Sequence, residues 1–159
     1  MENKTLSSKL KTVIILLAVL GIGLFAGAVP VALSLFVVAY PDFGEFFIPW
    51  LIFLSLASVP LFAILGLGFS VANEIAQDNS FSLKNAKRLK SVAMCLLAEA
   101  AYFFTGNLVL WFCNLNYPAV VLLSLALCLF AVGVAVAVNV LAQLVKKAVT
   151  LREDNEAII

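Results

Sequence analysis

The sequence contains no histidine, and only 12% of its residues are charged. Without histidine the chain has no Ser-His or Cys-His nucleophile, no HExxH zinc motif and no histidine-ligated metal. The three aspartates, Asp42, Asp78 and Asp154, all lie outside the long apolar runs, so a pair of intramembrane aspartates is missing as well. We therefore expect that the protein is not an enzyme and that it has no metal site and no cofactor.

Cysteine is also scarce. Cys95, Cys113 and Cys128 lie in or at the end of apolar segments and have no CxxC spacing. Isolated cysteines in such segments typically serve as small packing residues and do not indicate a redox compartment. The net charge is only +1 at pH 7, which gives no reason to expect direct binding of nucleic acid.

Apolar residues make up 64% of the chain, and the mean hydropathy is +1.13. Ordinary globular domains contain roughly 45–50% apolar residues and about 25% charged ones. So few polar residues cannot cover a surface that faces water, whereas a lipid bilayer accepts an apolar exterior. The composition predicts an integral membrane protein with the lipid bilayer as its main partner.

Four long apolar runs cover residues 12–39, 46–72, 91–112 and 119–145. A helix rises about 1.5 Å per residue and needs about 20 residues to cross a hydrocarbon core of about 30 Å. Each run is at least that long. We expect an all-α integral membrane four-helix bundle, with residues 1–159 forming one membrane domain.

The basic residues predict how these spans are oriented. They form three groups: Lys4, Lys9 and Lys11; Lys84, Lys87, Arg88 and Lys90; and Lys146, Lys147 and Arg152. None lies in the two other connections, residues 40–45 and 113–118, and the first of these carries Asp42 and Glu45. Because cytoplasmic loops are enriched in lysine and arginine, we expect an up-down-up-down arrangement in the cell membrane with both termini in the cytoplasm.

The start of the chain also resembles a secretory signal, with a basic beginning and the small triplet Ala26-Gly27-Ala28. The apolar run continues well past this triplet, to Ala39. This continuation favours a membrane anchor over a cleaved signal.

Small and polar residues predict which helix faces pack together, because they allow close approach in lipid. The first run contains Gly23-xxx-Gly27, which is either a packing seam or a chance result of a glycine-rich segment. The last run carries a stripe at spacings of three and four residues: Ser124, Cys128, Ala131, Ala135, Asn139 and Ala142. The third run has a similar stripe: Cys95, Glu99, Tyr102 and Gly106.

Glu99 is the one ionisable carboxyl inside an apolar run. Placing such a group in a membrane costs several kcal/mol, so it is either a packing element with a hydrogen-bond partner or a site for a proton, ion or ligand. We predict Asn139 as its partner, with rival partners in Tyr102, Ser55, Ser58 and Gln143. Glu99, Asn139 and Tyr102 are thus the intramembrane candidates for a site.

Residues 73–90 form the predicted cytoplasmic connection. Ser82 is a good helix cap, and the helix after it should continue without a break into the third run. Its basic residues Lys84, Lys87 and Arg88 suit anionic lipid head groups or a protein partner. The last run should continue as a helix into an acidic tail with an apolar end. That end, Ile158 and Ile159, is a second docking candidate.

Two stretches carry a resemblance to a known family. One is Asp78-Asn79-Ser80-Phe81-Ser82, which precedes the basic helix; the other is Leu141-xx-Leu144-xxx-Ala148-xx-Leu151, followed by an acidic tail with Asn155-Glu156. In these stretches and in its layout the chain resembles the bacterial four-span membrane proteins catalogued as domain of unknown function 2975. The resemblance implies that this protein is a companion of small Cro-type helix-turn-helix regulators. It implies no catalytic residues.

Two functions therefore remain open. The resemblance implies a membrane-held modulator or partner of a cytosolic DNA-binding regulator, acting through the cytoplasmic candidates. The alternative is a small transporter or ligand-binding or ion-binding bundle that uses Glu99. The chain has only four predicted helices, no paired charges and no inverted repeat. A transport path would therefore need a homo-oligomer.

Overall fold

The computed structural model describes residues 2–158, and it describes side chains from residue 3 to residue 155. Over this range the chain is 92% helical and contains no strand. The elements are α1 (Glu2–Ile22), the π-helical segment η1 (Gly23–Ala28), α2 (Val29–Ala39), the short 3₁₀-helix η2 (Pro41–Phe46), α3 (Phe47–Ala76), α4 (Leu83–Phe112) and α5 (Pro118–Ile158). The sequence prediction of an all-α fold is confirmed.

Four helical segments of the described chain are long and apolar enough to cross a membrane. They are Asn3–Ala39, Pro41–Ala76, Leu83–Phe112 and Pro118–Asn155. Each contains one of the four apolar runs and extends beyond it, so the predicted number of long apolar helices is confirmed. α1, η1 and α2 together form the first of these segments.

The change to a π-helix within the first segment has a local cause. Pro30 has no N–H group, and in a regular α-helix its ring would collide with the carbonyl of Ala26. A π-helical turn is a local bulge that relieves such a conflict without ending the helix. We attribute η1, which ends two residues before Pro30, to this proline.

The α3–α4 and α4–α5 connections use the same backbone conformation. Asp78 after α3 and Asn114 after α4 adopt left-handed backbone angles, with φ of 57° and 60°. The next N–H groups then donate back into the helix, from Asn79 to the Glu74 carbonyl and from Leu115 to the Leu110 carbonyl. Aspartate and asparagine tolerate this conformation better than other side chains do.

Ser82 begins α4 as predicted. Its hydroxyl accepts a hydrogen bond from the backbone N–H of Asn85 at 3.1 Å. The helix then runs without a break from Leu83 to Phe112, so the basic residues and the third apolar run belong to one element. α5 likewise continues past the last apolar run, as predicted.

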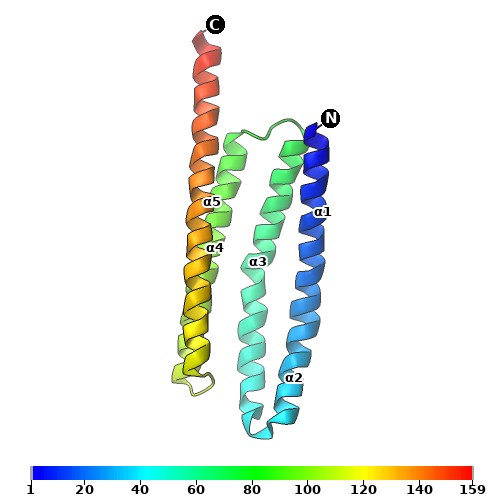
Figure 1. The fold of residues 1–159 in the computed structure, drawn as a ribbon, viewed down its shortest axis with the longest axis vertical. Helices are drawn as coiled ribbons and strands as arrows, with labels where there is room; N and C mark the ends of the chain where they lie inside the picture. Colours follow the sequence, from blue (N-terminus) through cyan, green and yellow to red (C-terminus); the bar gives the residue numbers. More distant parts are fainter. Residues whose placement is uncertain (1, 159) are drawn as a thin grey trace.

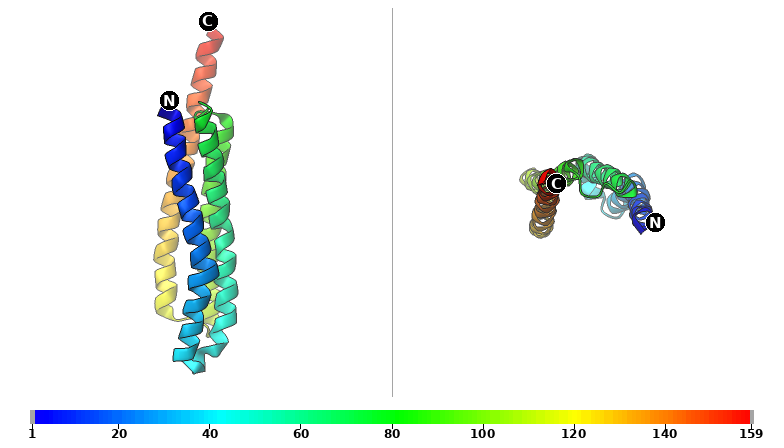
Figure 2. Two further views of the ribbon diagram at one scale, coloured as in Figure 1. Left: turned by 90° about the vertical axis from the view of Figure 1, so that its right-hand side faces the viewer. Right: turned by 90° about the horizontal axis from the view of Figure 1, so that it is seen from above.

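The helices form an open, curved row. α1 packs on α3, α3 packs on α4, and α4 packs most extensively on α5. Among the described residues α1 has no backbone contact with α4 or α5, and the view from above in Figure 2 shows the resulting arc. The helices therefore do not close into the bundle that the sequence predicted.

Helix faces explain why the row stays open. The small and polar stripe of α5 is buried at Ser124, Cys128, Ala135 and Ala142, and the Cys128 thiol donates to the Ala100 carbonyl of α4. This stripe packs against α4, the one helix that α5 contacts among the described residues. The Gly23-xxx-Gly27 seam is also unused, because both glycines face open space within the described chain.

Candidate functional site

The two ends of the row differ in chemistry. Figure 1 places the first turns of α1, the α3–α4 connection and the end of α5 at one end of the molecule, and η2 and the α4–α5 turn at the other. All the basic residues lie in the first turns of α1 and α4 or in the part of α5 after its apolar run, and we call this end the basic end. The other end is called the η2 end.

A polar cluster at the basic end joins α3 to α4. The Glu74 carboxylate lies 3.0 Å from the Lys84 ammonium and 3.2 Å from the Arg88 guanidinium. The Asn79 side chain donates to the same carboxylate at 2.9 Å. Asn85, which is 1% exposed, donates to the carbonyls of Asn79 and Ser80 and accepts from Arg88. Two cations and an amide donor stabilise the charged form of Glu74.

The polar cluster changes the interpretation of two docking candidates. The Arg88 side chain is only 21% exposed, and it also donates to the Ser70 carbonyl of α3. Arg88 therefore holds the connection in place and is not a free docking group. Lys84 also pairs with Glu74, but its side chain remains 66% exposed and can still meet a partner.

The α1 helix is tied to this end by two further hydrogen bonds. The Ser7 hydroxyl, which is buried, donates to the Ala72 carbonyl at 2.6 Å, and the Asn3 side chain donates to Asp78 at 2.7 Å. Sequence analysis missed Glu74 and Asn85 as members of the cluster. The sequence feature that could have indicated the cluster is Glu74 itself. This acidic residue follows an apolar run, and a short connection separates it from four basic residues.

A hollow of about 340 Å³ lies between the α3–α4 connection and the end of α5. We call it the end hollow. Its lining residues are Asn79, Phe81, Ser82, Leu83, Val149, Arg152 and Glu153. Phe81 is 63% exposed and is the largest apolar side chain of the set. The end hollow combines exposed apolar surface with charges of both signs, a composition that suits a protein partner.

A second hollow of about 430 Å³ runs between α4 and α5 at the basic end. We call it the lysine groove. Its lining residues are Leu83, Ala86, Lys87 and Lys90 from α4, and Asn139, Ala142, Gln143 and Lys146 from α5. The structure thus places the docking candidate Lys87 beside the intramembrane candidate Asn139, a combination that sequence analysis did not anticipate.

The structure does not pair Glu99 with Asn139. Oε2 of Glu99 is buried and has no hydrogen-bond partner among the described residues. Asn139 shares the lysine groove with Lys90, and Glu99 lies nine residues, or about 14 Å, further along α4. The predicted Glu99–Asn139 interaction is therefore wrong, because the two residues lie at different depths.

Tyr102, the third intramembrane candidate, has a different partner. Its hydroxyl donates to the Phe53 carbonyl of α3 at 2.9 Å, and its ring stacks on the Phe53 ring at a centroid distance of 5.3 Å. Tyr102 therefore joins α4 to α3.

The last docking candidates are at the end of the tail. The side chain of Ile158 and the whole of Ile159 lie outside the described residues.

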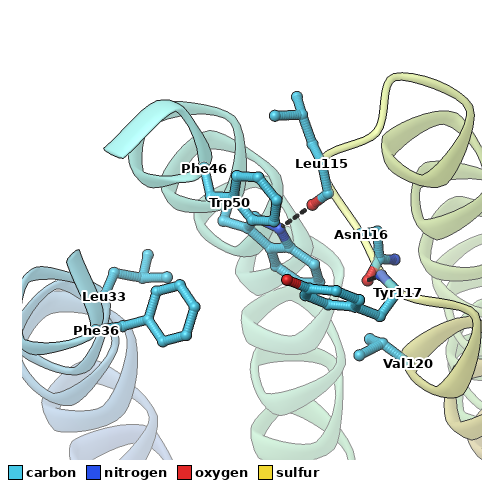
Figure 3. A pocket seen from close by; sticks show the side chains of 8 residues that line it. All are labelled: Leu33, Phe36, Phe46, Trp50, Leu115, Asn116, Tyr117 and Val120. Atoms are coloured by element: carbon cyan, nitrogen blue, oxygen red, sulfur yellow. Dashed lines mark hydrogen bonds between the residues drawn. The ribbon is translucent and has the colours of Figure 1, made fainter. Parts of the chain in front are cut away.

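A pocket of about 250 Å³ lies at the η2 end, and Figure 3 shows its lining. The lining residues are Leu33, Phe36, Phe46, Trp50, Leu115, Asn116, Tyr117 and Val120. The Trp50 indole donates to the Leu115 carbonyl at 2.8 Å, the dashed line of Figure 3. The Asn116 amide is already satisfied by Asn107 and by the Tyr117 N–H. The pocket is therefore aromatic and apolar, and it suits only an apolar group.

Fold and composition define the class of this protein: it is an all-α, multi-pass membrane protein with four apolar helices in the described chain. Residues 36–159 match the sequence model of the family described as protein of unknown function (DUF2975). The chain belongs to this family. The match includes α3, α4 and α5, and therefore the polar cluster, the end hollow and the lysine groove.

No curated protein and no solved structure matches the chain. The family description assigns no activity.

Proposed function

We propose that the protein crosses the cell membrane four times in an up-down-up-down arrangement, with the basic end in the cytoplasm. All ten lysine and arginine residues belong to this end, and the η2 end carries Asp42 and Glu45. The reverse orientation would oppose the positive-inside tendency at every basic residue. Both termini and the end hollow are then cytoplasmic.

We further propose that the protein is a non-catalytic membrane partner of a cytosolic DNA-binding regulator of the helix-turn-helix type. One observation supports this most directly: the two stretches that carry the family resemblance meet at the end hollow. Asn79, Phe81 and Ser82 come from the first stretch, and Val149, Arg152 and Glu153 lie within or just after the second. Residues far apart in sequence thus form one cytoplasmic surface.

The chemistry of the end hollow suits reversible docking. Phe81 and Leu83 supply apolar surface, and Arg152 and Glu153 supply charges that set the orientation of a partner. A regulator bound there is withdrawn from DNA, and the membrane protein itself needs no contact with nucleic acid. A shift of α5 relative to the α3–α4 connection would reshape the hollow and release the partner, since a few kcal/mol suffice to change occupancy.

Affinity capture of the full-length protein in mild detergent tests this proposal. We compare a hollow variant, Phe81→Ala with Arg152→Gln, with a matched control, Leu6→Ala with Lys9→Gln. Each pair removes one exposed apolar side chain and one positive charge from the basic end. We expect a helix-turn-helix protein to be captured by the unmodified protein and the control, and captured at least about tenfold less by the hollow variant. Equal capture by both variants, or no DNA-binding protein in any capture, would contradict the proposal.

Glu99 supports a second candidate function, a small transporter or an ion-binding or ligand-binding assembly. Its buried, unpartnered Oε2 is the observation that favours it. Because the row of helices is open, a closed path would need a second copy of the chain.

Two variants of Glu99 separate this candidate from a purely structural role. An unpartnered buried carboxyl costs stability, so Glu99→Leu should leave thermal stability in detergent unchanged or raised. If Glu99→Leu lowers stability and Glu99→Gln does not, the carboxyl has a structural partner and this candidate function is abandoned. If both variants stay folded and lose proton-dependent or ligand-dependent activity in vesicles, the transport or ligand-binding function is favoured over the docking function.

A further inference from the structure

We propose that the lysine groove binds the phosphate head group of an anionic phospholipid from the cytoplasmic leaflet. This inference depends on the proposed orientation and not on the regulator. It gives the surface between α4 and α5 a ligand of its own, separate from the end hollow.

The groove is built from two matching stripes. On α4 the residues are Leu83, Ala86, Lys87 and Lys90, and on α5 they are Asn139, Ala142, Gln143 and Lys146. Both sets follow the spacing i, i+3, i+4, i+7, which places every member on one face of its helix. Ala86 and Ala142 are buried and form the floor, because their small side chains let the two helices approach closely.

Charge selects an anion. The three lysines of the groove are exposed, and none of them forms an ion pair with a described side chain. No carboxylate lines the groove. Glu74 of α3 pairs with Lys84 and Arg88, neither of which lines the groove, so it does not neutralise this site. Three exposed lysines that line one groove without a carboxylate are typical of a head-group phosphate site at a membrane surface.

The amides extend the site toward the membrane. Asn139 and Gln143 also have no hydrogen-bond partner among the described residues. α4 and α5 run in opposite directions, so Lys90 lies near the depth of Asn139, which is seven residues, or about 10 Å, deeper than Lys146. A phosphate held by Lys87 and Lys146 at the mouth of the groove would therefore leave Asn139 and Gln143 within reach of the glycerol and ester groups of the same lipid.

The surroundings distinguish a lipid from a free phosphate ion. One turn deeper on the same two faces lie Met94 and Val136, which are 58% and 56% exposed. These side chains offer acyl chains an apolar path that starts at the groove. A free phosphate would gain nothing from this path, and the volume of about 430 Å³ exceeds what a single small anion fills.

Native mass spectrometry of the purified full-length protein in detergent tests the proposal. Phosphatidylglycerol and phosphatidylcholine with identical acyl chains are the two lipid probes, and inorganic phosphate is added as a competitor. The groove variant is Lys87→Gln, Lys90→Gln and Lys146→Gln. The control variant, Lys4→Gln, Lys9→Gln and Lys147→Gln, removes the same charge from exposed lysines outside the groove.

We expect one phosphatidylglycerol to bind the unmodified protein and the control with similar affinity. The groove variant should bind it roughly tenfold or more weakly, because each lysine near the membrane surface contributes measurably to anionic lipid binding. Phosphatidylcholine should bind weakly to all three proteins, and millimolar phosphate should not displace the lipid. A variant with Asn139→Ala and Gln143→Ala, at unchanged charge, should bind phosphatidylglycerol several-fold more weakly.

Three results would overturn the proposal. Equal loss of binding in the groove and control variants would mean a general surface attraction. Equal binding of the two lipids would mean that the groove does not select the net negative charge of the head group. Displacement by inorganic phosphate would mean that the groove takes the free ion. If the groove variant is unfolded in a thermal scan, the Asn139 and Gln143 variant decides: unchanged binding in that variant contradicts the proposal.

Discussion

At the scale of single residues, the basic end is organised by side chains that satisfy buried backbone groups. Asn85 fastens the α3–α4 connection, Ser7 fastens α1 to α3, and Arg88 connects Glu74 to the Ser70 carbonyl. These contacts give a physical reason for the stretch Asp78-Asn79-Ser80-Phe81-Ser82. Asp78 reverses the chain, Ser82 caps α4, and Phe81 is left exposed at the end hollow.

Asn85 provides a direct test of this organisation. Asn85→Ala removes both donors to the connection and leaves the carbonyls of Asn79 and Ser80 without this partner. We expect a loss of about 1–3 kcal/mol in unfolding free energy, measured by denaturation in detergent. Asn155→Ala, at an exposed position of α5, is the control and should change stability by less than about 0.5 kcal/mol. Equal effects of the two substitutions would contradict the role of Asn85.

At the scale of elements, packing depends on where small residues allow large ones to enter. Gly106 of α4 lies against the ring of Phe53 from α3, and that ring also stacks on Tyr102 and Phe103. The contact fixes α3 on α4 near the middle of the row. Gly133 of α5, by contrast, faces open space within the described chain.

These two glycines make a matched pair for measurement. A methyl group at Gly106 would overlap the Phe53 ring, so Gly106→Ala should cost about 1–3 kcal/mol of stability. Gly133→Ala meets no neighbour and improves helix propensity, so it should be neutral or stabilising by up to about 1 kcal/mol. Thermal unfolding of both variants in the same detergent gives the comparison. A Gly106→Ala protein as stable as Gly133→Ala would show that Phe53 does not pack as described.

Sequence patterns predicted the elements better than their partners. Run lengths gave the four apolar helices, Ser82 gave the start of α4, and the stripe around Cys128 and Ala135 gave the packing face of α5. A stripe identifies a face, but it does not say which helix covers that face. For this reason the open row was not predicted, and neither was the unused seam at Gly23.

The candidate site shows the same limit. Lys87 and Asn139 were each singled out from sequence, but for different reasons, and only the register between α4 and α5 brings them into one groove. That register depends on the α4–α5 turn and on contacts such as Cys128 to Ala100, which no local pattern contains. The same register separates Asn139 from Glu99.

At the scale of the whole molecule, the open row gives each end its own surface. The basic end combines the polar cluster, the end hollow and the lysine groove, whereas an apolar, aromatic pocket lies at the η2 end. α5 extends past the other helices at the basic end in Figure 1 and forms one wall of both basic-end surfaces. Both proposals therefore require that the basic end faces the cytoplasm.

Thiol labelling in intact cells tests this requirement most directly. Cys113 is exposed at the η2 end, so the unmodified protein should react with a membrane-impermeant thiol reagent before the cells are opened. The double variant Cys113→Ser with Thr150→Cys places the exposed thiol at the basic end, and it should react only after the cells are permeabilised. Cys113→Ser alone controls for the half-buried Cys95 and the buried Cys128. Labelling of the Thr150→Cys thiol in intact cells, with Cys113 protected, would contradict the cytoplasmic placement on which both proposals depend.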